Sequence, residues 1–469
     1  MSRAPSGSTI VLRRGAYHES IAIESKQLTI QNYPGEAAWM DGSSVVTGWA
    51  QSGNTWVKEG WTTRFDYSPT FFRGAPDYTA PGWNFVNPAY PMAAHPDQMW
   101  VDGVVQQQVD SLAKVAPGTF YLDEATSRLY LGTDPTNRLV RASDLAKALS
   151  VRGAGSVIRG LGIVRYAPSV WQIGAVSFER PGIVAEDLTV GGSATAGIGV
   201  TAANITLNRV TVDNNGLMGV LANEAYGLRM TRSRIVRNND EHFNTSPAAG
   251  GMKITRSRGI VIQDSDFRDN LGTGIWFDES DYDIAVIGDN FVNNANHGTF
   301  LELSSTATVV DNVYLGNLNT GLQVNDTDRV QVWNNTFVGN GRAVNVVQDL
   351  RRASDTSAAG HDRARPLPDP TVSWVVKDVS IVNNVVAQPN ARANCVVCVE
   401  DYSHVFSAEQ MQVRLRTNIY NRTTGWPTWF AIWSRGPGNP AVYASLSAFQ
   451  AASGQDGGSY SFDGVSEVD

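Results

Sequence analysis

The sequence contains very little cysteine. Only Cys395 and Cys398 occur among its 469 residues, in the run NCVVC. A redox-active CxxC stands at the start of a helix beside a βαβ unit, whereas this pair lies in a valine-rich run that is typical of a strand. A zinc site needs further ligands at matching spacing, and the sequence offers none. We therefore expect two buried or mutually paired cysteines, and we predict no cofactor.

Long hydrophobic runs are also missing. No stretch of 18 apolar residues occurs, so the sequence predicts no membrane-spanning helix. The first twenty residues lack the apolar segment of a signal peptide. Residues 8–12 already read as a strand at one end of a repetitive structure, and such an end exposes apolar groups unless it is capped. We expect a leader and a cap upstream of this chain and a secreted or extracellular protein, with a cytoplasmic location as the alternative.

Positive charge is in short supply as well. The chain has 37 basic and 45 acidic residues, a net charge of −8, and only six lysines. Nucleic-acid-binding proteins normally carry clustered basic residues and a high pI. The composition therefore predicts no nucleic-acid partner, and it leaves the oligomeric state open.

A repeat dominates the middle of the chain. An asparagine recurs every 23 to 31 residues and closes a similar phrase each time, following a short β-rich run. The six positions are Asn215, Asn239, Asn270, Asn294, Asn317 and Asn340. A repeat this short, without helical periodicity, predicts an all-β solenoid of stacked coils. Identical amides in successive coils can donate to and accept from one another, so we expect this column to be a structural ladder.

The period divides the chain into three parts. Residues 1–47 are predicted to form the first coils, and residues 146–469 the main stack, with a polar loop at 351–370 and a C-terminal cap that holds a short helix. Residues 48–145 break the period with a stretch rich in aromatics and proline that ends in hairpin-like runs. We interpret this stretch as an inserted β-rich, sandwich-like module. If the insertion and the loop close the ends of a groove, the protein acts on chain ends.

Five strands of the repeat begin with glycine and align residue for residue. They read GVLAN, GMKIT, GIWFD, GTFLE and GLQVN, and they start at Gly219, Gly251, Gly274, Gly298 and Gly321. Alternate residues of a strand point to opposite sides. The first and third residues after each glycine are largely apolar and are predicted to face the core. The second and fourth are predicted to face solvent.

Asp278 and Glu302 occupy the same outward position on neighbouring coils. Parallel strands lie about 4.8 Å apart, so we expect the carboxyl groups to be roughly 5–6 Å from each other. This separation suits a retaining glycosidase, whereas an inverting enzyme needs a wider gap. Lys253 lies one coil from Asp278 and favours its ionised form, while the aromatic neighbours of Glu302 disfavour its charge. We predict Asp278 as nucleophile and Glu302 as general acid/base.

Further outward or nearby residues are candidates for substrate binding. Trp276 and Phe300 would be costly as bare surface but can serve as platforms for the C–H face of a sugar ring. The full set of candidates is Trp276, Phe300, Lys253, Gln323, Asn325, His297 and His242. The acidic turn after Asp278, with the run DESDYD, could ligate a cation, but such turns are usually solvated, and we predict no metal site.

The asparagine-closed coils, the pair GIWFD and GTFLELSS, and the insertion WVDG to GTFYLDEATSRLYLG resemble the right-handed parallel β-helix enzymes of the pectate-lyase-like superfamily. Within it, the chain is most similar to β-helix glycoside hydrolases such as the family-120 β-xylosidases. The resemblance implies an inserted β-rich module and an Asp and a Glu on consecutive coils as nucleophile and acid/base. These roles fall on Asp278 and Glu302.

Two other functions remain open at this point. A Ca²⁺-dependent polysaccharide lyase would use Lys253 as the base and the two carboxylates as ligands. The face has one cation where anionic substrates usually meet several, which favours the hydrolase. A non-catalytic adhesin or fibre would need no matched carboxylates. For the hydrolase and for the lyase, the expected partner is a carbohydrate.

Overall fold

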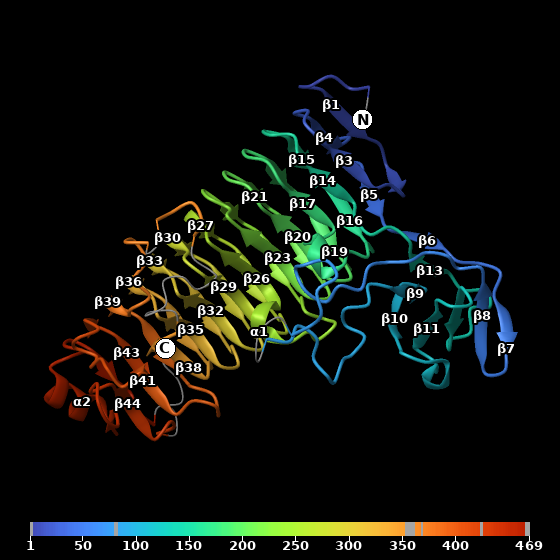
Figure 1. Ribbon diagram of the computed structural model, residues 1–469. Coiled ribbons are helices and arrows are strands. Elements are labelled where there is room, and N and C mark those ends of the chain that lie inside the picture. Colours follow the sequence, from blue (N-terminus) through green and yellow to red (C-terminus); the bar gives the residue numbers. More distant parts are fainter. Residues whose placement is uncertain (1–2, 79–82, 352–361, 367–368, 423–424, 465–469) are drawn as a thin grey trace. The chain divides into compact units, whose positions relative to one another are not determined.

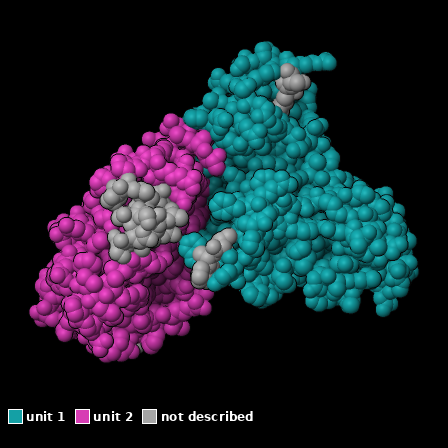
Figure 2. Space-filling model, in the orientation of Figure 1, with its two compact units in different colours: residues 1–200, 210–221, 238–249 teal, residues 201–209, 222–237, 250–469 magenta. Residues whose placement is uncertain are grey.

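The computed structural model describes residues 3–78, 83–351, 362–366, 369–422 and 425–464. These residues are almost entirely β-structure, and the helices among them are short (Figure 1). No helix in these ranges is long and apolar enough to cross a membrane. The chain divides into two compact units (Figure 2): unit 1 holds residues 1–200, 210–221 and 238–249, and unit 2 holds residues 201–209, 222–237 and 250–469.

Three sheets of parallel strands make up the coils of unit 1. The first is ordered β1 (Thr9–Leu12), β4 (Thr29–Asn32), β15 (Val157–Arg159), β18 (Val184–Glu186). The second is ordered β2 (Gly15–Tyr17), β5 (Ala38–Asp41), β16 (Leu161–Val164), β19 (Thr189–Gly191), β22 (Thr211–Asp213). The third is ordered β3 (Ile21–Ile23), β14 (Leu149–Val151), β17 (Val176–Phe178), β20 (Ala196–Val200).

Unit 1 also contains a mostly antiparallel sheet of eight strands between residues 43 and 143. Its order is β6 (Ser43–Val45), β13 (Val140–Ser143), β9 (Met99–Val101), β10 (Val104–Gln108), β11 (Thr119–Asp123), β12 (Arg128–Leu131), β8 (Thr55–Glu59), β7 (Ala50–Ser52). A separate apolar cluster that includes Met99, Phe120 and Leu131 packs against this sheet. Unit 1 further holds the 3-10 helices η1 (Leu112–Lys114) and η2 (Val170–Gln172) and the helix α1 (Thr245–Ala248).

The coils of unit 2 are built from three longer parallel stacks. The first is β21 (Thr206–Asn208), β24 (Arg229–Thr231), β27 (Arg258–Gln263), β30 (Tyr282–Ile287), β33 (Ser305–Val310), β36 (Asp328–Trp333), β39 (Lys377–Val382), β42 (Val413–Arg416). The second is β25 (Arg234–Val236), β28 (Asp266–Arg268), β31 (Asn290–Val292), β34 (Val313–Leu315), β37 (Thr336–Val338), β40 (Val385–Ala387), β43 (Ile419–Asn421), β46 (Tyr460–Ser461).

The third stack of unit 2 carries the candidate site. Its parallel strands are ordered β26 (Gly250–Thr255), β29 (Thr273–Asp278), β32 (His297–Glu302), β35 (Thr320–Asn325), β38 (Arg342–Gln348), β41 (Cys395–Asp401), β44 (Trp429–Trp433). The last strand, β45 (Ala441–Tyr443), pairs antiparallel with β44. The remaining strand, β23 (Met218–Asn223), has residues in both units. The predicted all-β architecture of parallel stacked coils is confirmed.

Side-chain alternation explains why these segments form strands around a core. In β29, Ile275 and Phe277 are completely buried, and they align with Thr299 and Leu301 of β32. Each coil thus adds its apolar residues to one continuous interior, as expected when a solenoid buries the face that a single repeat cannot bury alone.

The predicted asparagine ladder is present. The amide of Asn270 donates to Asn294, that of Asn294 to Asn317, and that of Asn317 to Asn340, each at 2.9 Å. We call these four residues the asparagine ladder. In unit 1 the ladder partner of Asn215 is Asn238, at 2.8 Å. The prediction of Asn239 at this position was wrong by one residue.

The side chain of Asn239 instead donates to the backbone carbonyl of Phe243, at 3.0 Å. The coil that follows is enlarged by residues 240–249, and Asn239 closes the first turn of this extra loop with φ in the left-handed region. An asparagine doublet therefore serves two purposes here, and the sequence pattern alone does not separate them.

Gly274, which opens one of the aligned strands, lies where the next coil and the ladder come close. A Cβ at Gly274 would lie 2.5 Å from the carbonyl oxygen of Gly298 and 3.0 Å from the amide nitrogen of Asn294. The ladder amide therefore approaches the strand so closely that no side chain fits. Beside the ladder, Phe267, Phe291, Tyr314 and Phe337 form a buried stack with centroid spacings of 5.1, 4.8 and 4.7 Å. The aromatic residues of the repeat thus stack inside the core.

A second ladder escaped the sequence analysis. Asn312 donates to Asn335 at 2.9 Å, Asn335 to Asn384 at 3.0 Å, and Asn384 to Asn418 at 3.1 Å. Asp289 takes the same place one coil earlier, where its backbone N–H donates to Asn312 at 2.8 Å. The signal was available, because Asp289, Asn312 and Asn335 each stand five residues before a member of the asparagine ladder.

Loop 351–370 lies partly outside the described residues, at 352–361 and 367–368. The described part is fixed by Arg258 of β27, which pairs with Asp362 at 3.1 Å and with Asp369. Tyr226 also donates to Asp362, at 2.5 Å. The short helix predicted near the C-terminus is present as α2 (Leu446–Ser453). The domain boundaries at 1–47, 48–145 and 146–469 remain predictions.

Candidate active site

One column of side chains runs along the face of the third stack of unit 2 that is turned away from the core. It consists of Lys253, Trp276, Phe300, Gln323 and Asn345, which are register partners on β26, β29, β32, β35 and β38. We call this column the outer row. The residue-for-residue alignment predicted for the strands that start at Gly251, Gly274, Gly298 and Gly321 is therefore correct.

The first three members of the outer row stack on one another. The ammonium of Lys253 lies 3.4 Å from the ring centroid of Trp276, a cation–π contact. The rings of Trp276 and Phe300 are stacked, with centroids 5.2 Å apart and planes inclined by 14°. The coil spacing imposes this stacking, because parallel strands hold equivalent side chains at a fixed distance.

Asp278 and Glu302, which we call the acid pair, stand next to this row. The paired register between β29 and β32 ends at Phe277 and Leu301, and the acid pair occupies the following position on each strand. Lys253 pairs with Asp278, with 2.8 Å between Nζ and Oδ2. Glu302 accepts a hydrogen bond from the indole N–H of Trp276 at 2.9 Å and forms an ion pair with Arg351. Each carboxylate therefore has its own cation.

The predicted exposure of this face was wrong. The exposed fractions of Trp276, Asp278 and Glu302 are only 7, 6 and 4 %, and Gln323 and Asn325 are buried too. The reason is that neighbouring coils cover one another: the aromatic rings stack, and cations lie against both carboxylates. The acid pair still belongs to the outer face, because Arg351, whose side chain is 53 % exposed, reaches Glu302 from outside.

Burial gives Glu302 an unusual protonation behaviour. Burial raises the pKa of Glu302 to about 7, and the charge of Asp278 adds to this rise, while Arg351 and Lys253 act in the opposite direction. A carboxyl group with a pKa near neutrality can both donate and accept a proton at physiological pH. Asp278 lies against the ammonium group of Lys253 instead.

Arg351 was not among the predicted site residues. It follows β38, and its backbone N–H and Nε donate to Asp349 at 2.7 and 2.9 Å. Asp349 in turn lies close to Asn325, whose amide donates to Asp349 and Asp326 at 3.4 and 3.3 Å. The polar run QDLRR after the strand was the available signal, but its path back to Glu302 depends on a turn that the repeat does not encode.

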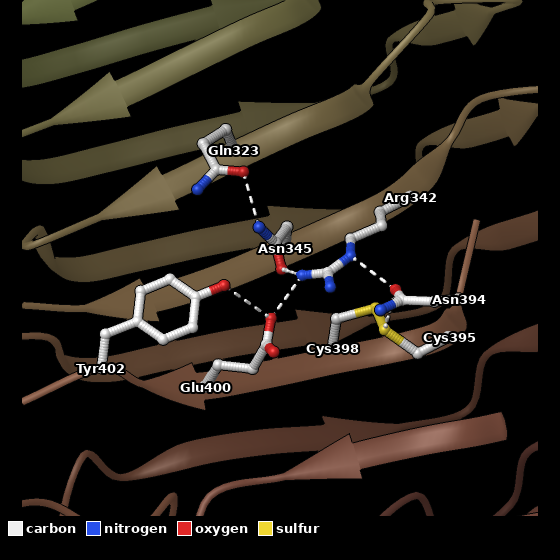
Figure 3. The surroundings of a disulfide bond; sticks show 8 residues. All are labelled: Gln323, Arg342, Asn345, Asn394, Cys395, Cys398, Glu400 and Tyr402. Atoms are coloured by element: carbon white, nitrogen blue, oxygen red, sulfur yellow. Dashed lines mark hydrogen bonds and ion pairs between the residues drawn. A yellow bond between two sulfur atoms is a disulfide. The ribbon is translucent and has the colours of Figure 1, made fainter. Parts of the chain in front are cut away.

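The outer row continues into a polar cluster beside the disulfide (Figure 3). Asn345 donates to the carbonyl oxygen of Gln323 at 2.7 Å, and Arg342 donates to Asn345 at 2.5 Å and pairs with Glu400. The cysteines of β41 are bonded to each other, and both are buried. The amide of Asn325 is likewise used within the protein, so the two amides predicted to bind substrate both have protein partners.

The two histidines have different surroundings. His297 of β32 contacts the hydroxyl of Thr320 at 2.6 Å and lies 5.0 Å from the ring of Phe300. Burial lowers the pKa of His297 to about 4, so this ring is neutral near pH 7. His242 belongs to unit 1 and stacks on Tyr90 at a centroid distance of 4.2 Å. The substrate-binding role of both remains a prediction.

The acidic turn after Asp278 has protein partners. Glu279 pairs with Arg256 at 2.6 Å. Asp281 is fully buried and accepts from the backbone N–H groups of Ser257 and Asp278, at 2.6 and 3.2 Å. Within the described ranges, no group of three or more His, Cys, Asp or Glu side chains is arranged to hold a metal ion.

Comparison with known proteins gives a consistent fold. Residues 174–348 match the family model described as right handed beta helix region. No curated protein matches the sequence. The structure of XylC in complex with xylose has a TM-score of 0.66 at 14 % identity, covering 90 % of this chain and 79 % of XylC.

Two other similar structures are more distant. One is a glycoside hydrolase, with a TM-score of 0.48, 10 % identity, and coverage of 72 % of this chain and 88 % of the other. The other is pectate lyase Pel9A, with a TM-score of 0.30, 8 % identity, and coverage of 90 % and 68 %. The stacked parallel sheets, the family match and the likeness to the XylC structure establish that the chain is a right-handed parallel β-helix protein with a fold like that of XylC.

Proposed function

We propose that this protein is a retaining glycoside hydrolase in which Asp278 is the nucleophile and Glu302 the general acid/base. The observation that carries the proposal is the acid pair itself: two carboxyl groups on adjacent parallel strands, beside stacked aromatic rings, with a cation on each. The coil spacing of about 4.8 Å supports the short carboxyl separation of retaining enzymes. The fold shared with a xylose-bound protein agrees with a sugar substrate.

The reaction would proceed in two steps. In the first, the carboxylate of Asp278 attacks the anomeric carbon while the protonated Glu302 gives its proton to the glycosidic oxygen, so that the aglycone leaves as an alcohol. In the second, the ionised Glu302 takes a proton from water, which attacks the anomeric carbon and displaces Asp278. Two inversions retain the anomeric configuration. Lys253 stabilises the carboxylate of Asp278, which attacks in the first step and leaves in the second.

The outer row suggests the substrate class. Trp276 and Phe300 stack on one another next to the acid pair, so the surroundings of the two carboxylates are apolar. The nearby cations Lys253 and Arg351 are each paired with a carboxylate, which leaves little positive charge for an acidic sugar at this position. We therefore infer a neutral sugar of a plant- or microbial-type polysaccharide or oligosaccharide. Action on chain ends, as in β-xylosidases, is part of this proposal.

A panel of nitrophenyl glycosides tests the function. We expect hydrolysis of one glycoside with retention of the anomeric configuration. NMR should then show that the first product formed is the anomer with the same configuration as the substrate. Asp278→Asn should lower kcat by at least ~10⁴-fold and leave the thermal midpoint nearly unchanged. Full activity of Asp278→Asn, or initial release of the opposite anomer, contradicts the assignment. Rapid loss of polymer viscosity without release of monomer contradicts action on chain ends.

The lyase alternative makes a different demand on Lys253. A lyase base must reach a proton of the substrate, whereas the ammonium of Lys253 is paired with Asp278 and lies over the ring of Trp276. Unsaturated products that absorb in the ultraviolet, with activity lost on addition of a chelator, would support the lyase. Absence of any activity would support a non-catalytic fibre or adhesin.

A further inference from the structure

Unit 1 contains a hollow outside its core, far along the sequence from the acid pair. Its volume is about 580 Å³, and its lining includes Arg14, Ala16, Trp39, Asp41 and Arg165. Ala16 lies on β2, Trp39 and Asp41 lie on β5, and Arg165 directly follows β16. None of them is used in the proposed reaction.

Trp39 forms the floor of the hollow and lies flat. Its register partners on the two neighbouring strands are Ala16 and Gly162, the smallest residues available. A Cβ at Gly162 would lie only 2.1 Å from the indole Cε3 atom, so the ring rests directly on the backbone of β16. The indole is nevertheless 39 % exposed. One ring face is thus packed against the backbone, and the other is turned to solvent.

The rim of the hollow carries surplus positive charge. Asp41 is the only carboxylate in the lining, and it is already paired with Arg165 at 2.5 Å and Arg141 at 2.8 Å. Burial acts to raise the pKa of Asp41, but hydrogen bonds from Arg165 and Ser43 outweigh it and hold the pKa below its usual value. Two arginines therefore share one carboxylate that stays ionised.

Arg14 adds a further charge beside Trp39. In the described part of the chain, its guanidinium has no hydrogen-bond or ion-pair partner; the nearby carboxylate of Glu36 is taken by Arg13, at 2.6 Å, and by the backbone N–H of Arg14. A positive hollow with an aromatic floor stands out in a chain with a net charge of −8. Arginine pairs with carboxylate and sulfate groups in a planar, two-pronged manner.

We propose that this hollow is a second carbohydrate-binding site, which holds a sugar ring on the free face of Trp39 and an acidic substituent of the glycan at Arg14 and Arg165. The proposal rests on the proposed function only in taking a glycan as the ligand. The two sites would bind different parts of one polysaccharide. The bond to a neutral sugar is cleaved at the acid pair, and an acidic substituent binds in the hollow of unit 1.

Affinity electrophoresis of the full chain carrying Asp278→Asn tests the site without hydrolysis. We expect migration to be slowed in gels that contain glucuronoxylan or polygalacturonate. Trp39→Ala should weaken the apparent affinity about three- to tenfold. Trp333→Ala is the matched control, because Trp333 is similarly exposed but lies on β36 outside this hollow, and it should leave migration unchanged. Gly162→Val, which lifts the indole off the strand, should mimic Trp39→Ala.

The charge requirement is tested by a second comparison. Arg14→Ala should weaken retardation by the acidic polysaccharides but not by neutral arabinoxylan, and added salt should weaken retardation by the acidic polymers only. Equal migration of Trp39→Ala and the parent in the acidic gels overturns the site. Equal effects of Arg14→Ala in acidic and neutral gels overturn the acidic ligand. Thermal midpoints identify any variant that has lost its fold.

The outcomes separate this site from the proposed reaction. Residual retardation of Trp39→Ala reports binding at the outer row, and Trp276→Ala removes it. If the wild-type protein hydrolyses a glycoside but is not retarded, the hollow is not a site and the reaction stands. If Trp39→Ala abolishes retardation while Asp278→Asn keeps full activity, the hollow stands and the catalytic assignment fails.

Discussion

The asparagine ladder and the outer row belong to the same coils of unit 2, yet they follow opposite rules. In the ladder one residue type recurs from Asn270 to Asn340, and each amide is satisfied by the next. In the outer row the residue changes at every coil, from a cation through two aromatics to two amides. A column that repeats one residue type is typical of a structural role. A column such as the outer row, in which the residue type changes from coil to coil, is where we expect chemistry.

Two acidic residues show the same contrast at the level of single groups. Asp289 and Glu302 are both buried, and burial raises the pKa of both, to about 8 and about 7. Asp289 accepts from the backbone N–H groups of Ser265 and Ile287, which are fixed by the strands. Glu302 contacts the side chains of Trp276 and Arg351. Side-chain partners such as those of Glu302 can move when a substrate binds, whereas the backbone partners of Asp289 cannot.

After the loss expected for Asp278→Asn, the largest effect is expected for Glu302→Gln. For a substrate with a poor leaving group, the loss of the acid should lower kcat/KM by ~10²- to 10⁴-fold. For a dinitrophenyl glycoside, whose leaving group needs no proton, the fall should be much smaller. Steady-state kinetics with both substrates measures the difference. Asp289→Asn makes a similar acid-to-amide change in the interior and is the control; an equal loss in that variant, or an equal loss for both substrates, would rule out the acid role.

The ladder should respond in stability rather than in rate. Asn317→Ala removes an amide that donates to Asn340 and to the carbonyl of Phe291, and it takes away the acceptor that the side chain of Asn294 uses in the ladder. We expect a loss of about 1–3 kcal/mol in the free energy of unfolding, measured by urea denaturation. The kcat of the folded variant should be unchanged.

Asn290→Ala provides the comparison for the ladder variant. Asn290 is an exposed asparagine at the start of β31. Its replacement should alter the free energy of unfolding by less than about 0.5 kcal/mol. If Asn290→Ala and Asn317→Ala are equally stable, the ladder contributes no more than any surface amide.

The register of the candidate site was predictable from the sequence, because strand alternation and coil spacing are strict rules. The alignment of the strands that begin with glycine predicted the relative positions of Lys253, Trp276 and Asp278. The structure has the same alignment. The same rules gave the asparagine ladder from Asn270 onward. Both rest on a period of 23 or 24 residues that these coils repeat without insertion.

What failed depends on residues that leave the period. Alternation states which way a side chain points but not what covers it, so the burial of the acid pair was missed. Arg351 reaches Glu302 only after a turn beyond β38, and Asn238 replaces Asn239 where residues 240–249 enlarge a coil. Non-local partners of this kind follow from the path of the chain, which a repeat pattern does not contain.

Arg351→Met sharpens the comparison through pH. The positive charge of Arg351 favours the ionised form of Glu302, so its removal should raise the pKa of the acid further. A general acid acts below its pKa, and activity falls as the pH rises through it. We therefore expect the alkaline limb of kcat/KM to move upward by about one pH unit. Arg329→Met, which removes a cation paired with Asp328 at 2.6 Å, should leave that limb in place. If the alkaline limb of kcat/KM does not move in Arg351→Met, Arg351 does not influence the pKa of the catalytic acid.

The smallest effect is expected for Asp289→Asn in the second ladder. Burial raises the pKa of Asp289 to about 8, whereas an unfolded aspartate has a pKa of about 4. Between these values the folded protein holds a proton that the unfolded chain has lost, so this residue makes the free energy of unfolding fall as the pH rises. An amide removes that contribution, and the slope between pH 5 and 8 should flatten by up to about 1 kcal/mol per pH unit.

Buried Asp281 and Asp326, whose pKa values burial also raises, keep the slope of Asp289→Asn from vanishing. The exposed Asp283→Asn is the control and should leave the slope as it is. Urea denaturation at several pH values measures both variants. If Asp289→Asn leaves the slope unchanged, the second ladder holds this acid as a carboxylate, and the contrast between Asp289 and Glu302 then lies in their hydrogen-bond partners rather than in the proton.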